Sequence, residues 1–166
     1  EMLNAKDWMI YRNDLAGTEV YSQQDINNIS IDTDWQKVIF RTAPMANYEL
    51  SSSGGNDKTR FFISGNYYNQ EGILIGTDYK RINGRANIDH KINEKLNIGT
   101  SIGLTYAKTN RVEGDQSLQG PLPNGISTPA IYPVYNPDGS YNQDGPYSNA
   151  VSIANEAINE NFSFRT

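Results

Sequence analysis

The sequence predicts an all-β fold, a segment of an antiparallel membrane β-barrel with about four or five strands, preceded by short helices. Three observations favour this fold. Apolar and polar residues alternate with a period of two from residue 45 to residue 108, which is typical of strands with one apolar face. The alternating stretches are about 10–13 residues long, which suits tilted strands that cross a bilayer. The connections between them are alternately short and long, as at the two ends of a membrane barrel.

The first 44 residues predict short helices and loops. Apolar residues at loosely helical spacing indicate a helix from Glu1 to about Leu15, and a polar connection follows. Thr33 and Gln36 fit the capping-box pattern that begins a helix. This second helix should end before Pro44, because a proline disfavours helix in the residue that precedes it.

Residues 45–110 predict four antiparallel strands, of which the clearest is Arg81 to Ile92. Its even-numbered positions are apolar or small except His90, and its odd-numbered positions are polar. Arg85 lies mid-strand, where a lipid-facing arginine would cost about 2–4 kcal/mol, so the polar face should line the lumen of the barrel. The side chains predicted to face the lumen are Asn83, Arg85, Asn87, Asp89 and Lys91.

Residues 111–159 predict one long extracellular loop, and residues 160–166 predict the start of the next strand. The loop carries four tyrosines among asparagine, glutamine and aspartate residues. Tyrosine offers a large aromatic face with a polar tip, so these rings could contact a sugar or a peptide. They could equally pack the loop on itself, on a plug or on a lid protein. The candidate substrate-binding residues are Tyr132, Tyr135, Tyr141 and Tyr147.

Composition excludes several classes of protein. Acidic residues outnumber basic ones by 19 to 14, giving a net charge of −5, which argues against nucleic acid as a partner. Cysteine is absent, and the single histidine, His90, lies on the opposite strand face from Asp89, so the two cannot pair for catalysis. No metal-ligand or phosphate-loop pattern is present. We therefore expect no catalytic residue, no metal and no cofactor, and do not expect an enzyme.

Several motifs, taken in order, resemble the SusC/RagA family of TonB-dependent outer-membrane transporters. They are spread over nearly the whole chain and are most dense between residues 33 and 108. The matching stretches are Thr33–Gln36, Ile39–Pro44, Asn47–Ser51, Ser53–Asn56, Phe62–Gly65, Tyr68–Ile73, Tyr79–Arg81, Gly84–Arg85, Asp89–Lys91 and Asn136–Tyr141.

The resemblance implies a plugged barrel of the 22-stranded class in the bacterial cell outer membrane. Such transporters import oligosaccharides, peptides or other nutrients and work with a SusD-like lipoprotein lid. The chain shows no plug domain and no TonB box, and a closed barrel needs at least eight strands. We therefore expect a segment of a longer protein, whose missing N-terminal part would contact TonB. The alternative is a soluble secreted β-sandwich or carbohydrate-binding module that uses the tyrosine-rich loop.

Overall fold

A computed structural model describes residues 2–112, 118–156 and 159–165. Its internal contacts divide the chain into two compact units. The sheet unit comprises residues 43–72, 77–111 and 159–165. The helical unit comprises residues 2–42, 73–76, 112 and 118–156.

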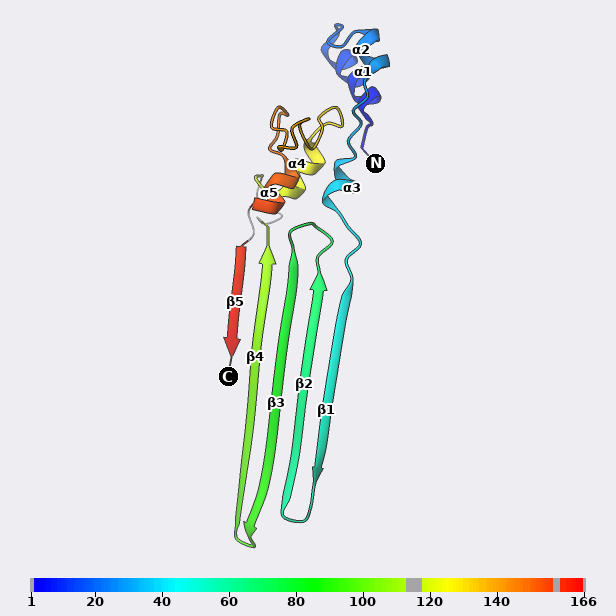
Figure 1. Ribbon diagram of the computed structural model, residues 1–166. Coiled ribbons are helices and arrows are strands. Elements are labelled where there is room, and N and C mark those ends of the chain that lie inside the picture. Colours follow the sequence, from blue (N-terminus) through cyan, green and yellow to red (C-terminus); the bar gives the residue numbers. More distant parts are fainter. Residues whose placement is uncertain (1, 113–117, 157–158, 166) are drawn as a thin grey trace. The chain divides into compact units, whose positions relative to one another are not determined.

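The sheet unit is one antiparallel sheet of five strands in the order β1-β2-β3-β4-β5, so each strand pairs with the next one along the chain (Figure 1). This confirms the predicted fold class. Strands β3 and β4 each have 16 residues, more than the sequence pattern predicted. The strands are β1 (Met45–Gly55), β2 (Thr59–Glu71), β3 (Asp78–Asn93), β4 (Leu96–Arg111) and β5 (Asn159–Arg165).

Asparagine side chains close the two short turns. After β1, the Asn56 Oδ1 atom accepts hydrogen bonds from the backbone N–H groups of Lys58 and Thr59, both at 2.9 Å. After β3, the Asn93 Oδ1 atom accepts from the backbone N–H of Lys95 at 2.9 Å. Asparagine is favoured in turns because its short side chain can satisfy backbone donors that the ladder leaves unpaired.

Strand register separates the sheet unit into a polar face and an apolar face. On the polar face, Asn66 of β2 lies opposite Asn83 of β3. On the apolar face, Tyr67 lies opposite Ile82. Because side chains alternate along a strand, one matching pair fixes the face of every other residue in that pair of strands.

The helical unit contains α1 (Ala5–Ala16), α2 (Gln23–Asn28), α3 (Trp35–Ile39), α4 (Pro121–Ser127) and α5 (Ala150–Glu156). Helix α1 begins later than predicted, after Asn4, whose side chain accepts a hydrogen bond from the Asp7 N–H. The predicted capping box at Thr33 is wrong. Asp34 caps α3 instead, by accepting from the backbone N–H of Lys37 at 3.1 Å.

Two helices arise where the sequence predicted none. Helix α2 lies in the polar connection, where Ser22 and Asp25 form a reciprocal capping box. Helix α4 lies in the long segment after β4 and has Pro at its start, where the missing N–H costs no helical hydrogen bond. None of the helices in the described ranges is long and apolar enough to cross a membrane.

A small core holds the helical unit together. Trp35 and Ile39 of α3 pack with Ala150 and Val151 of α5, and all four side chains are buried. The indole N–H of Trp35 donates a hydrogen bond to the backbone oxygen of Pro129 at 3.3 Å. The long segment after β4 is thus organised around α3, although the two are far apart in sequence.

Candidate functional site

The polar face of the sheet unit carries a ladder of amides across three strands. The Asn66 Nδ2 atom of β2 donates to Asn47 Oδ1 of β1 at 2.6 Å, and Asn83 Nδ2 of β3 donates to Asn66 Oδ1 at 3.4 Å. An amide that both donates and accepts leaves hydrogen-bonding capacity for water or for a ligand. This face can therefore present alternating donors and acceptors.

The remaining predicted lumen-facing residues continue along β3 on the same face. Asn87 accepts a hydrogen bond from the Ser101 hydroxyl of β4 at 2.8 Å. Register places Arg85 opposite Ser64, and Asp89 opposite Arg60. Alternation therefore brings the five predicted residues onto one face, and β3 spaces them along its length rather than in one cluster.

The polar face also carries a cluster of Tyr68, Tyr79 and Arg81 that the sequence pattern did not predict. The Arg81 guanidinium lies 5.6 Å from the ring centroid of Tyr68, and the Tyr68 ring lies 5.8 Å from that of Tyr79. The Tyr68 hydroxyl donates to Gln70 Oε1 at 2.7 Å. The odd-numbered parity that Arg81 shares with Arg85 predicts its place on the polar face, but no sequence pattern predicted its contact with Tyr68.

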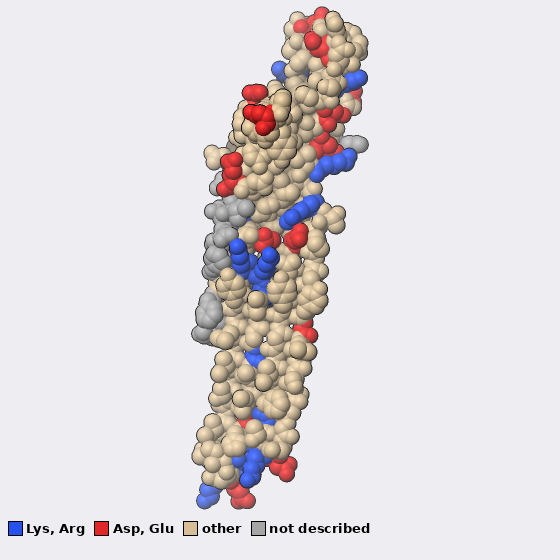
Figure 2. Space-filling model, viewed as in Figure 1, with Lys and Arg blue, Asp and Glu red and all other residues tan. Residues whose placement is uncertain are grey.

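The apolar face leaves large side chains open to the surroundings. Five aliphatic residues on β3 and β4 are each 44–54 % exposed: Ile82, Ile88, Ile98, Ile102 and Leu104. Figure 2 shows one side of the molecule, on which the middle of the sheet is nearly free of charge and charged side chains gather toward its ends. Large aliphatic side chains exposed on neighbouring strands, as Ile98, Ile102 and Leu104 are here, require a covering of protein or lipid.

His90 lies on the apolar face near the short-turn end. Its Nδ1 atom is 2.8 Å from the Thr59 hydroxyl, its register partner on β2. The adjacent Asp89 points to the polar face, so these two side chains form no catalytic pair. Among the described residues, no group of three or more histidine, aspartate and glutamate side chains is placed to hold a metal ion.

The four candidate tyrosines lie in the helical unit and differ in exposure. Tyr132 and Tyr141 pack against the core around Trp35, whereas Tyr135 and Tyr147 are 51 % and 48 % exposed. Tyr135 stacks on Tyr141 with ring centroids 5.4 Å apart. The structure therefore joins one exposed ring to one packed ring and leaves Tyr147 as a separate exposed ring.

Another pair of aromatic rings packs together in this unit. The Trp8 and Tyr21 rings meet edge to face, 5.9 Å apart, and the Arg12 guanidinium lies 5.8 Å from the Trp8 ring. Burial raises the pKa of the Tyr21 hydroxyl. The nearby Tyr132 hydroxyl raises the pKa of Tyr21 further, whereas the positive charge of Arg12 lowers it and offsets part of the increase.

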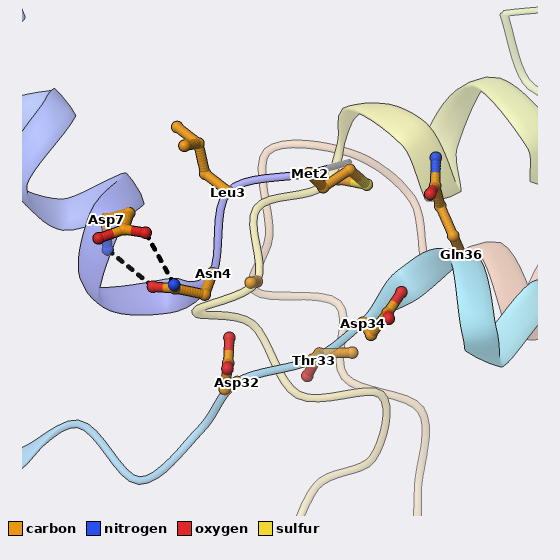
Figure 3. Close-up of a pocket in the computed structure, with 9 residues that line it drawn as sticks. Met2, Leu3, Asn4, Asp7, Asp32, Thr33, Asp34 and Gln36 are labelled. Atoms are coloured by element: carbon orange, nitrogen blue, oxygen red, sulfur yellow. Dashed lines mark hydrogen bonds between the residues drawn. The ribbon is translucent and has the colours of Figure 1, made fainter.

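Aspartates line a hollow of about 510 Å³ in the helical unit (Figure 3). Asp32 accepts a hydrogen bond from the Ala5 backbone N–H at 2.8 Å, and Asp7 accepts one from the Asn4 side chain at 2.7 Å. Hydrogen bonds from the backbone and side chain of Lys37 lower the pKa of Asp34. The hollow thus presents acceptor oxygens, several of which the protein itself engages.

The fold defines a class of protein: long antiparallel strands with opposed polar and apolar faces, as in the wall of a membrane barrel. Two solved structures share this fold. The RagAB peptide transporter matches 93 % of this chain and 22 % of its own, with a TM-score of 0.68 and 22 % identity. The RagAB peptide importer in its open-open state matches 91 % of this chain and 21 % of its own, with a TM-score of 0.60 and 22 % identity.

Curated relatives are similar in sequence to this chain over nearly its whole length. TonB-dependent receptor P26 of Formosa agariphila is 31 % identical over 99 % of this chain, and receptor P3 of the same organism is 30 % identical over 96 %. TonB-dependent receptor SusC of Bacteroides thetaiotaomicron is 26 % identical over 89 %. The chain is therefore similar to TonB-dependent receptors, SusC among them, which confirms the resemblance in its motifs.

The match covers a small part of each relative. The chain spans 17 % of receptor P26, 16 % of receptor P3 and 14 % of SusC. No protein-family model matches the chain.

Proposed function

We propose that this chain forms part of the wall and the outer loops of a TonB-dependent importer in the bacterial outer membrane. The polar face lines the lumen, the apolar face contacts lipid, and residues 111–159 form an extracellular loop. The importer carries an oligosaccharide or a peptide. It works with a SusD-like lipoprotein lid and with TonB, which other parts of the protein contact.

One observation carries this proposal: register places the large aliphatic side chains of the four long strands on one face, although Phe62 falls on the other. They are Leu50, Ile63, Ile82, Ile88, Ile98, Ile102 and Leu104. Leu96 and Tyr106 lie ten residues apart on this face of β4 and span about 33 Å of strand at about 3.3 Å per residue. A strand tilt of about 40° reduces this span to about 25 Å, the height of the apolar band around outer-membrane barrels. The similar proteins are named as TonB-dependent receptors and as a peptide transporter, and these names support transport rather than catalysis.

Cysteine labelling in the full-length protein tests which face meets lipid. Ile88 and Asn87 are adjacent on β3 and have opposite parity. A cysteine at Ile88 should react with a lipid-soluble maleimide. A cysteine at Asn87 should react only with a water-soluble one. Reversed labelling would contradict the assignment of the faces, and folding of residues 1–166 as a monomer without detergent would favour a soluble β-sandwich.

The exposed tyrosines are the proposed substrate contacts within the helical unit, together with their packed neighbours Tyr132 and Tyr141. Tyr135→Ala and Tyr147→Ala should each weaken binding of the transported substrate, since an aromatic ring offers a large contact area. Binding is measured on the purified transporter with the oligosaccharide or peptide that supports growth. Tyr11→Ala removes another exposed ring of the helical unit and is the matched control. Equal affinity of all three variants and the wild type would exclude this role.

A further inference from the structure

Register collects basic side chains on the polar face of the sheet unit. Over β1 to β4 this face carries five basic and two acidic residues, a net charge of +3, although the whole chain has a net charge of −5. The polar face therefore differs in sign of charge from the chain as a whole. Its basic residues are Arg60, Arg81, Arg85, Lys91 and Arg111, and its acidic residues are Glu49 and Asp89.

Arg85 stands among small and uncharged side chains near the middle of this face. Its register partners are Ser64 of β2 and Gly103 of β4, and Asn83 and Asn87 flank it on the same face of β3. Within the part of the chain that the structure describes, its guanidinium has neither an ion-pair nor a hydrogen-bond partner. A cation on a polar surface without a partner is free to bind an anion from outside the sheet.

Neither carboxylate of the polar face lies beside Arg85. Asp89 is four residues further along β3, about 13 Å away at about 3.3 Å per residue. The Asp89 Oδ1 atom leans toward β4, where it lies 2.6 Å from the position that a Cβ would take on Gly99. Glu49 belongs to β1, two strands away from β3, and lies opposite Asn66. The charge of Arg85 is therefore available to a ligand.

Arg81 supplies a second cation, four residues before Arg85 on the same face of β3. Its guanidinium lies 5.6 Å from the centroid of the Tyr68 ring, and its Nε atom is buried without a hydrogen-bond partner. A guanidinium stacked on an aromatic ring is already oriented, so it loses little further freedom when its N–H groups bind an oxyanion. A buried donor without a partner is costly, so an acceptor from a ligand is favoured.

The side chains around the two arginines suit a ligand with many hydroxyl groups. Asn83 lies between the arginines, and its Nδ2 atom donates to Asn66 Oδ1 at 3.4 Å. Amides and hydroxyls both donate and accept, as the hydroxyl groups of a sugar do, and large aliphatic side chains that would hold apolar residues of a peptide do not occur among the register partners of Arg81, Asn83 and Arg85 on β2 and β4. Those partners are Tyr68, Asn66, Ser64, Ala107, Thr105 and Gly103.

We propose that Arg81 and Arg85 bind the anionic groups of an acidic oligosaccharide that the importer carries. The guanidinium N–H groups donate charge-assisted hydrogen bonds to oxyanion groups of the sugar chain. The two arginines are about 13 Å apart along β3, so an extended oligosaccharide contacts both while the Asn83 amide between them binds its hydroxyl groups. This proposal rests on the proposed function, because it requires the polar face to line the lumen through which the substrate passes.

Binding of matched charged and neutral oligosaccharides by the full-length protein tests this site. The protein is purified in detergent and titrated with carboxymethyl-dextran, unmodified dextran or polyglutamate of similar chain length, and affinity is measured by isothermal titration calorimetry. The test variant is Arg81→Gln with Arg85→Gln. Arg85→Gln alone, at an exposed position, keeps the test valid if loss of the contact with Tyr68 disturbs folding. The matched control is Lys80→Gln with Lys108→Gln, which removes the same charge from the opposite face.

We expect the wild type and the lysine control to bind carboxymethyl-dextran more tightly than dextran. Each arginine should contribute about tenfold through charge-assisted hydrogen bonds, so Arg85→Gln should bind carboxymethyl-dextran about tenfold more weakly and the double arginine variant about 100-fold more weakly. Equal affinity of the wild type for the two dextrans would overturn the proposal, as would unchanged binding in the arginine variants or an equal loss in the lysine control. Tighter binding of polyglutamate through the same arginines would also overturn it, because the ligand would then be an acidic peptide.

Cysteine labelling at Ile88 and Asn87 separates this proposal from the proposed function. If labelling follows the assigned faces but the arginine variants bind carboxymethyl-dextran as the wild type does, only the anionic-ligand site fails. If labelling is reversed, the polar face does not line the lumen, and both proposals fail.

Discussion

Arginine placed at matched positions on the two faces of β4 provides a quantitative test of the barrel assignment. The apolar face of β4 runs from Leu96 to Tyr106, and Ile102 lies within one residue of its midpoint. Register pairs Ala86 with Ile102 of β4, which is 52 % exposed on the apolar face. Ile102→Arg therefore puts a guanidinium close to the middle of the bilayer.

The expected cost of each arginine follows from its depth. A lipid-facing arginine costs about 2–4 kcal/mol at the bilayer midplane and about 0–1 kcal/mol near the interfaces. Ile102→Arg should thus destabilise the barrel by about 2–4 kcal/mol, and Ile82→Arg, opposite Tyr67 at the outer end of the apolar face, by about 1 kcal/mol or less. Ser101→Arg adds the same side chain to the polar face, one residue from Ile102, and should have little effect.

Heat-modifiable mobility in a detergent gel measures this difference on the full-length protein. A folded barrel migrates as a compact species until heat unfolds it, so the conversion temperature reports its stability. We expect the lowest conversion temperature for Ile102→Arg, while Ile82→Arg and Ser101→Arg stay near the wild type. If Ser101→Arg is as damaging as Ile102→Arg, or if neither has an effect, the assignment of lumen and lipid faces is refuted.

Two further predictions concern the helical unit. Trp35→Ala should destabilise this unit by about 3–5 kcal/mol because it removes a buried aromatic side chain, whereas Trp35→Phe should cost less. The backbone N–H of Thr33 donates to the backbone oxygen of Ala130, and its hydrogen-exchange rate measures the destabilisation in each variant. If Trp35→Ala keeps the protection of the wild type at this amide, the role of this core is contradicted. Hydrogen bonds from Ser22 lower the pKa of Asp25 in the folded state below its ordinary value of 3.8. The Asp25 carboxylate therefore caps α2 fully at any pH above 3.8, and this contribution is lost as the pH falls through the lowered pKa. Amide protection in α2, corrected for intrinsic exchange, should fall at low pH in the wild type, and an identical fall in Asp25→Asn would exclude this cause.

The strands could be predicted from the sequence because their signal is local. Each residue of β3 reports its face through parity alone, so Arg85 and Ile88 were placed correctly on opposite faces without knowledge of their neighbours. The family motifs added the larger architecture, which no segment of this length can encode by alternation.

The helices and the core of the helical unit were harder to predict. Helix α2 is short and polar, and Ile26 is its buried residue, so it carries no apolar stripe that a periodicity test could detect. Helix α4 begins with Pro121 and contains Gly125, which are poor indicators of helix. The hydrogen bond from Trp35 to Pro129 joins residues 94 positions apart, and no local pattern specifies such a pair.

Gly76 lies where the two ends of the connection between β4 and β5 come close together. Residues 112–158 connect β4 to β5. Closing a loop of this length costs about 2 kcal/mol more in conformational entropy than closing a three-residue turn. Gly76 has a φ of +79°, and a Cβ there would collide with the Ala154 backbone oxygen and lie 2.8 Å from Val112 Cγ1. Val112 and Ala154, near the two ends of that segment, thus meet at a residue without a side chain. Their approach brings the two ends of this segment together, which lowers the closure entropy that the pairing of β4 with β5 must overcome.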